Sequence, residues 1–168
     1  MTKQQFAAML LAGALSLTAC SSLAAASSDS LEARIATCPT TAPDPETYLY
    51  GEEGGLQVFI SHEGVWEALP PGRDGGYGQK VFWKYPGYSV VEDPTPDLDI
   101  IGEQLDGDGY FVQTGPATNA YAADLLGSAI LTGVEFPQAG CWQITGEYRD
   151  ATLTFVAWVS GQSASQEK

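Results

Sequence analysis

The strongest constraint in the sequence is the stretch from Phe136 to Val159, which reads FPQAGCWQITGEYRDATLTFVAWV. It contains two runs of residue types that favour strands, separated by a polar corner at residues 148–150. Alternate positions in both runs are apolar, so each arm has one side to bury. We predict an antiparallel hairpin with Trp142 and Phe155 in the same interior. An isolated hairpin is marginal in water, so it must complete a larger sheet.

From residue 46 onward, short strand-like runs alternate with turn clusters, and little of the chain has a helical pattern. Residues 113–119 look irregular, and residues 121–126 favour a single helical turn. The predicted strands are 48–50, 56–60, 65–69 (as a continuation of 56–60 after a turn), 80–85, 100–105, 110–112 and 128–136. This pattern predicts an all-β fold, an antiparallel β-sandwich of about seven to nine strands.

The first nineteen residues have the build of a secretory signal peptide, with Lys3 followed by an apolar run that is too short for an ordinary membrane span. The tetrapeptide LTAC at residues 17–20 resembles the bacterial lipobox, in which small residues precede a cysteine that is acylated and becomes the new N-terminus. The resemblance implies lipidation of Cys20. The alternative is an ordinary cleaved peptide and a soluble exported protein. The predicted segments are a signal peptide at 1–19, a lipidated linker at 20–37, a β-sandwich at 38–162 and a disordered tail at 163–168.

The chain has three cysteines, an odd number for an exported protein. If Cys20 carries lipid, Cys38 and Cys141 remain and can form a disulfide in an oxidising compartment. Closing a loop of about a hundred residues is worth at most roughly 4–5 kcal/mol in the chain-entropy model. The alternative is two separate buried thiols.

The motif FPxxGCWxI at residues 136–144, followed by a strand that ends in VAWV, resembles the last two strands of immunoglobulin-like domains in uncharacterised bacterial lipoproteins. The resemblance implies an immunoglobulin-like fold and a place in the cell envelope, but no particular activity. Trp83 suits the core tryptophan of that architecture. However, Cys38 precedes the first strand, and Ala139 stands where a tyrosine is expected two positions before Cys141. A Cys38–Cys141 bond would therefore hold the N-terminal segment and would not join the sheets.

The charge is strongly one-sided, with 7 basic and 21 acidic residues and a net charge of −14. Residues 1–19 contain one lysine and no acid, so their removal leaves 6 basic and 21 acidic residues, a net charge of −15. Such a surface repels nucleic acid and anionic lipid head groups, and we expect no nucleic-acid partner. Membrane attachment must then depend on the N-terminal lipid.

No catalytic motif is complete. Residues 87–91, GYSVV, lack the second glycine of a nucleophile elbow. The single histidine, His62, follows Ser61, whose side chain would point to the opposite face if both lay on one strand, so we interpret His62 as a turn residue. Nothing in the sequence selects a carboxylate pair for glycoside hydrolysis among the 21 acids.

The residues also predict no cofactor. One histidine and two paired cysteines cannot supply a zinc site, and an EF-hand fails because Tyr110 and Phe111 occupy ligand and glycine positions. The remaining metal candidate is a calcium site built from four aspartates, Asp97, Asp99, Asp106 and Asp108.

Residues 73–88, RDGGYGQKVFWKYPGY, combine aromatic side chains with three of the six basic residues of the mature chain. Aromatic rings beside cations make good contact surfaces. The candidate binding surface consists of Tyr77, Lys80, Lys84 and Tyr88. The alternative is that Val81, Trp83 and Tyr85 are core residues and the lysines face water opposite them.

Together these features predict an exported, lipid-anchored β-sandwich that acts as a binding or interaction module at the cell envelope, with a protein or glycan partner. Two alternatives from other classes are an envelope enzyme that uses a carboxylate pair and a structural lipoprotein that acts through an exposed sheet edge.

Overall fold

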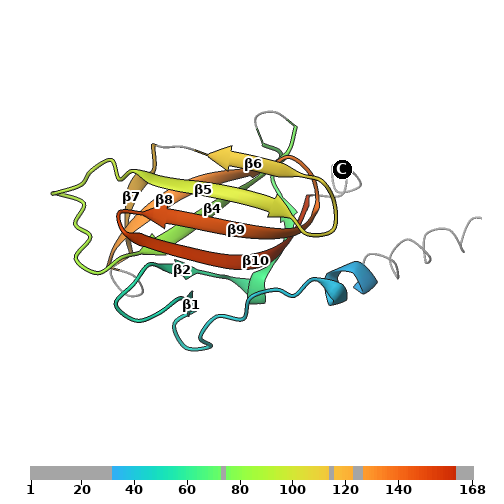
Figure 1. The fold of residues 1–168 in the computed structure, drawn as a ribbon, viewed down its shortest axis with the longest axis horizontal. Helices are drawn as coiled ribbons and strands as arrows, with labels where there is room; N and C mark the ends of the chain where they lie inside the picture. Colours follow the sequence, from blue (N-terminus) through green and yellow to red (C-terminus); the bar gives the residue numbers. More distant parts are fainter. Residues whose placement is uncertain (1–31, 73–74, 114–115, 123–126, 162–168) are drawn as a thin grey trace, which may run out of the picture. The chain divides into compact units, whose positions relative to one another are not determined.

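The computed structural model describes residues 32–72, 75–113, 116–122 and 127–161, and they confirm the all-β sandwich. Two five-stranded sheets form its layers (Figure 1). The first sheet has the order β1-β2-β4-β8-β7, and the second has the order β3-β10-β9-β5-β6. The strands are β1 Leu49–Tyr50, β2 Gln57–Phe59, β3 Val65–Leu69, β4 Tyr77–Lys84, β5 Leu98–Gln104, β6 Tyr110–Gln113, β7 Thr118–Ala122, β8 Gly127–Phe136, β9 Gly140–Tyr148 and β10 Ala151–Gly161.

The predicted signal peptide, Cys20 and residues 163–168 lie outside the described residues. Residues 32–37 are helical, and the compact unit that contains the sandwich begins at Ile35. No helix in the described ranges is long and apolar enough to cross a membrane.

The strand order is that of immunoglobulin domains. Strands β2-β4-β8-β7 follow the order A-B-E-D, and β5-β9-β10 follow the order C-F-G. All neighbouring strands pair antiparallel except β3, which runs parallel to β10. The architecture therefore has ten strands, one more than the upper end of the predicted range, because β7 was not predicted.

The predicted hairpin is confirmed as β9–β10, with a continuous register from Tyr148 opposite Ala151 to Gly140 opposite Val159. Trp142 and Phe155 are both fully buried in one core cluster. Strand β9 also pairs with β5, so the hairpin forms the centre of the second sheet.

The Trp83 side chain links the two sheets. Trp83 lies on β4 in the first sheet, and its indole N–H donates to Thr132 Oγ1 at 3.0 Å. Its ring packs edge-on against Phe155 of the second sheet, with 5.8 Å between ring centroids. The ring also fills the space above Gly146 on β9, where a Cβ would stand 2.5 Å from Trp83 Cη2. The interpretation of Trp83 as a core residue is confirmed.

Two parts of the predicted strand pattern are wrong. Residues 65–69 do not continue the strand at 56–60, because positive φ angles at His62, Glu63 and Gly64 turn the chain and β3 joins the opposite sheet. Strand β7 occupies 118–122, where an irregular segment and a helical turn were predicted, since Thr118 to Ala122 pair with the edge of β8. Strand pairing here overrides the local preference of alanine for helix. Residues 123–126 of the predicted helical turn lie outside the described residues.

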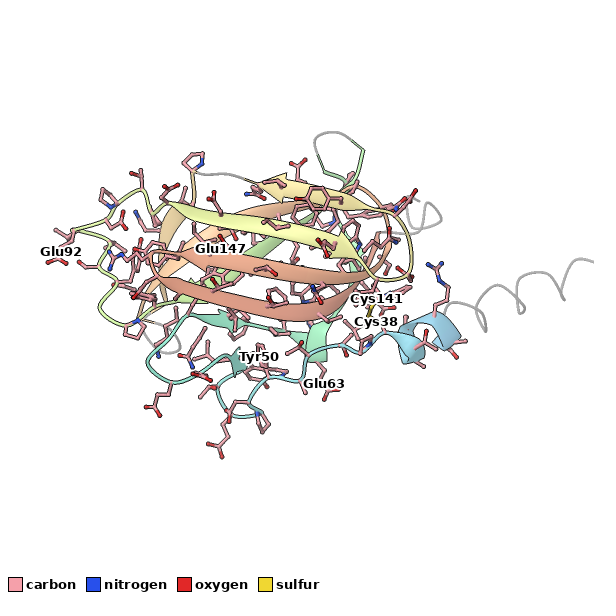
Figure 2. All side chains as sticks on the ribbon, viewed as in Figure 1. Cys38, Tyr50, Glu63, Glu92, Cys141 and Glu147 are labelled. Atoms are coloured by element: carbon pink, nitrogen blue, oxygen red, sulfur yellow. A yellow bond between two sulfur atoms is a disulfide. The ribbon has the colours of Figure 1, made fainter. Side chains whose placement is uncertain are left out.

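The predicted disulfide joins Cys38 to Cys141, with 5.6 Å between the two Cα atoms (Figure 2). Both cysteines pack with Trp158 and Ile35 in a small apolar cluster separate from the main core. Cys141 and Trp158 are opposite each other on β9 and β10, on the face of the second sheet that points away from the first. The bond therefore holds the N-terminal segment against the sandwich, as the position of Cys38 in the sequence predicts.

The contact between Trp83 and Gly146 makes a testable prediction. Gly146→Ala places a methyl group where the Trp83 ring lies, and overpacking of this kind should lower the free energy of unfolding by roughly 1–3 kcal/mol. Gly133→Ala is the matched control, because no atom lies within 4 Å of its added Cβ. Urea denaturation followed by circular dichroism measures both variants, and equal stability of the two would contradict the role of Trp83.

Candidate functional site

A groove of about 680 Å³ opens beside β1 and β2. Its volume lies within the range of roughly 300–1,000 Å³ that small-molecule sites occupy. Apolar side chains and three polar residues share its wall, and the lining residues are Ala42, Pro43, Pro45, Tyr48, Phe59, Ser61, His62 and Glu63.

The loop at residues 44–49 positions Tyr48. Asp44 Oδ1 accepts hydrogen bonds from the backbone N–H groups of Thr47 and Glu46 at 2.8 and 3.1 Å, and from Thr47 Oγ1 at 2.9 Å. The Asp44 N–H donates to the Leu49 carbonyl, and the Tyr48 N–H donates to the Asp44 carbonyl. These bonds, led by the one from the Thr47 backbone, hold the pKa of Asp44 below its usual value. The loop is therefore closed by its own hydrogen bonds and presents Tyr48 in a fixed place.

A left-handed turn positions the polar residues. His62, Glu63 and Gly64 have φ angles of 51°, 53° and 77°. The Gly64 N–H donates to the Ser61 carbonyl at 3.1 Å. Gly64 lies against the second sheet, where a Cβ would stand 3.1 Å from the carbonyl oxygen of Val156. Close packing at Gly64 therefore fixes the turn that carries His62 and Glu63.

Backbone strain is concentrated at this groove. Of the described residues other than glycine, five have positive φ angles: Tyr48, His62, Glu63, Ala68 and Arg149. Ala68 lies where the β3–β10 register shifts by one residue, and Arg149 lies in the β9–β10 turn. The other three all line the groove. Strained residues persist only where the surroundings hold them, and they often mark ligand sites.

The apolar wall of the groove is aromatic. The Tyr48 and Phe59 rings lie 5.8 Å apart at an interplanar angle of 52°, and Tyr48 is 47% exposed. Phe59 also packs into an apolar cluster with Leu49, Phe82 and Ala129. Phe59 is therefore fixed from behind, and the Tyr48 ring is available to a ligand.

The polar wall offers hydrogen-bonding groups but no assembled catalytic pair. Ser61 and His62 both line the groove. They do not share a strand, so the condition under which their side chains would point to opposite faces is not met. No hydrogen bond joins Ser61 Oγ to the His62 imidazole in the described structure. Glu63 is the single carboxylate among the lining residues, so the groove does not assemble the pair that glycoside hydrolysis uses. His62 lies in a turn, as predicted.

The four residues of the predicted binding surface do not lie on one face of the structure. Lys80 and Lys84 alternate with the buried Val81 and Trp83 along β4, so both lysines lie on the outer face of the first sheet. Tyr77 belongs to the inward set and packs against the core cluster. Tyr88 is only 6% exposed, so the prediction that it is a surface residue is wrong.

Tyr88 is buried because it belongs to a polar cluster at one end of the sandwich. Its hydroxyl donates to the Asp93 carbonyl at 3.2 Å, and the Tyr148 hydroxyl donates to Asp93 Oδ2 at 2.6 Å. The Arg149 guanidinium lies 3.6 Å from the same oxygen and 4.9 Å from the Tyr148 ring centroid. Burial raises the pKa of Tyr88, and burial together with the Asp93 bond raises the pKa of Tyr148. The cluster fastens the loop before β5 to the β9–β10 turn.

The four candidate calcium ligands do not form one site. Asp97 and Asp99 lie at the start of β5, whereas Asp106 and Asp108 follow its end, and a seven-residue strand separates the pairs by roughly 20 Å. Asp106 Oδ1 accepts hydrogen bonds from the Cys141 N–H at 2.8 Å and from Gln104 Nε2 at 3.0 Å. No group of three or more metal-ligating side chains occurs in the part of the chain that the structure describes.

Sequence reasoning found His62 and Ser61 but missed the groove. Tyr48 and Phe59 each lie in a predicted strand. The left-handed conformations of Tyr48 and Glu63 could not be predicted, since neither tyrosine nor glutamate favours them. The Asp44-Pro45 pair was the available sequence signal for the loop that positions Tyr48, because this dipeptide favours a turn. Comparison with protein-family models, curated proteins and solved structures finds no match.

The strained turn gives a second prediction. Glu63→Gly removes the steric conflict of a side chain at φ 53°, so it should raise the free energy of unfolding by about 1 kcal/mol. Glu67→Gly is the control, because this exposed β3 residue has no positive φ and the change should lower stability by roughly 0.5–1 kcal/mol. Urea denaturation compares the two, and destabilisation of similar size by both would show that Glu63 is unstrained.

Proposed function

We propose that this protein is an exported, lipid-anchored binding module that holds a neutral sugar residue of a cell-envelope glycan in the β1–β2 groove. The observation that carries the proposal is the combination of an exposed aromatic wall with three strained residues in one groove. Holding strained backbone costs free energy, so its concentration at Tyr48, His62 and Glu63 favours a ligand site over an accidental depression.

The chemistry of the groove favours a sugar. The flat face of the Tyr48 ring suits the C–H face of a sugar ring, and Ser61, His62 and Glu63 supply donors and acceptors for hydroxyl groups. A net charge of −14 disfavours anionic polymers. A neutral glycan satisfies both conditions.

The enzyme alternative gains no support from this groove, because Glu63 is its single carboxylate. The proposal therefore assigns binding to the site and assigns no reaction to it.

The export and anchoring part of the proposal is supported by the sequence and by the cysteine pairing. Disulfides persist in oxidising compartments outside the cytosol, so the Cys38–Cys141 bond agrees with export. That bond leaves Cys20 as the one cysteine of three outside it, in the place where the lipobox resemblance puts the acylated residue. The acyl chains would hold the sandwich at the membrane surface.

Substitution of the exposed ring tests the sugar site. Tyr48→Asn removes the ring but keeps a residue that tolerates the left-handed conformation, so the fold should survive. We expect binding of the full chain to neutral tetramers of N-acetylglucosamine or glucose to weaken by about tenfold or more, which corresponds to roughly 1.4 kcal/mol. Tyr110→Asn, a 57% exposed tyrosine on β6, should bind like the wild type. Isothermal titration calorimetry measures the affinity of each variant for the tetramers. Wild-type affinity in the Tyr48→Asn variant would refute the site.

The anchor has a separate test. Cys20→Ala in the full chain removes the acylated side chain, so the protein should move from the membrane fraction to the soluble fraction on cell fractionation. Mass spectrometry of the wild-type protein should find the lipid on Cys20. A Cys20→Ala protein that still partitions fully with membranes would exclude lipidation as the attachment.

A further inference from the structure

One edge of β10 is only half covered. Strand β9 pairs with β10 from Ala151 to Val159. On the other edge, β3 pairs only near the C-terminal end, at Trp158, Val159 and Gly161. The N-terminal half of that edge, residues 151–155, has no neighbouring strand among the described residues.

The backbone of this edge is free to form hydrogen bonds. Thr41 donates its N–H to the Val156 carbonyl at 2.9 Å, and the Val156 N–H donates to Thr41 Oγ1 at 2.8 Å, so both groups of Val156 point away from β9. Backbone groups alternate along a strand, so those of Thr154 and Thr152 point the same way. Across the described structure, no residue forms a hydrogen bond with them on that side. Two N–H groups and two carbonyls are therefore available to a partner.

A groove runs along this edge and has room for an extended segment. Its volume is about 630 Å³, and the edge of the first sheet forms its opposite wall. Tyr50, on that wall, is labelled in Figure 2. The lining residues are Asp44, Leu49, Tyr50, Gly51, Glu52, Gly55, Leu56, Ala151, Thr152, Leu153 and Thr154. None of them lines the Tyr48 groove, so the two sites are distinct.

The lining residues define the chemistry of an occupant. Leu49 and Leu56 are buried, and Leu153 packs against the core, so one side of the groove is apolar. Asp44 and Glu52 are its carboxylates, and no Lys, Arg or His lines it. A segment that alternates apolar with basic side chains would match both features, because successive side chains of a strand point to opposite sides.

The edge also lacks the usual protection. Exposed edges are commonly guarded by lysine, proline or a covering loop. Residues 151–155, ATLTF, contain neither lysine nor proline.

We propose that residues 151–155 of β10 are a docking edge for an extended segment of a protein partner in which apolar side chains alternate with Lys or Arg. The partner segment adds to the second sheet as a further strand, with its backbone bonded to Thr152 and Thr154, its apolar side chains against Leu56 and Leu153, and its cations beside Asp44 and Glu52. This interaction does not depend on the sugar site.

Amide hydrogen exchange of the full chain, followed by NMR, tests the proposal directly. In the free protein the amides of Thr152 and Thr154 should exchange at least tenfold faster than those of Leu153 and Phe155, which face β9. A saturating nonapeptide of alternating valine and lysine should slow Thr152 and Thr154 at least tenfold. Unchanged exchange with the peptide would overturn the proposal. Concentration-dependent protection without peptide would also overturn it, because the occupant would then be a second copy of this chain.

Two variants at one position separate backbone pairing from side-chain contact. Thr154→Pro deletes the outward N–H without removing a β9 bond, and proline is tolerated at edge positions of this kind, so peptide affinity should fall at least tenfold. Thr154→Val keeps the N–H and should bind like the wild type. Equal affinities of the proline and valine variants would refute strand addition.

Peptide controls make the test independent of the folding of the variants. A valine–lysine peptide whose backbone nitrogens on the bonding side are methylated should bind the wild-type chain at least tenfold more weakly. A valine–glutamate peptide should also bind at least tenfold more weakly, because its carboxylates would face Asp44 and Glu52. Binding of either control peptide at the affinity of the valine–lysine peptide would contradict the stated partner chemistry.

Discussion

The Trp83 indole, packed between the two sheets, is the contact on which this arrangement depends. It extends from β4 over Gly146 on β9, the two strands that correspond to B and F of immunoglobulin domains. Antibody domains join those strands with a disulfide. Here a large ring with its N–H bonded to Thr132 fills the same region. Because packing holds the sheets together, the Cys38–Cys141 bond can serve elsewhere and fasten the N-terminal segment to the outer face of the second sheet.

That fastening shapes both grooves. Cys38 and the hydrogen bonds between Thr41 and Val156 fix where the chain leaves β10. The chain then forms the Asp44 loop and the edge of the first sheet before the left-handed turn at residues 62–64 returns it to the second sheet as β3. A left-handed residue other than glycine costs about 1–2 kcal/mol, so these conformations persist only because both ends of the segment are held.

Hydrophobic alternation and cysteine counting were enough to predict the sandwich, the β9–β10 hairpin and the disulfide, because each depends on residue type and spacing. The partner of β3 could not be predicted, since a five-residue run does not indicate which sheet it joins. The prediction that Tyr88 is exposed was wrong for a related reason. A tyrosine that follows Pro-Gly is expected at the surface, but the backbone carbonyl of Asp93, further along the same loop, accepts a hydrogen bond from its hydroxyl. The groove depends on positive φ angles at Tyr48 and Glu63, and neither residue type favours such angles, so the sequence does not indicate them.

The acidity of the chain and the open edge of β10 are compatible for a physical reason. An uncovered edge with free N–H and carbonyl groups is normally a route to self-association. When two copies approach edge to edge, however, Asp44 and Glu52 of one chain come near those of the other, and the net charge of −14 adds repulsion at longer range. A basic segment experiences the opposite field, which attracts it to the groove. In the proposed interaction, the same charges would oppose pairing of the edge with itself and favour a cationic partner, without lysine or proline on the edge.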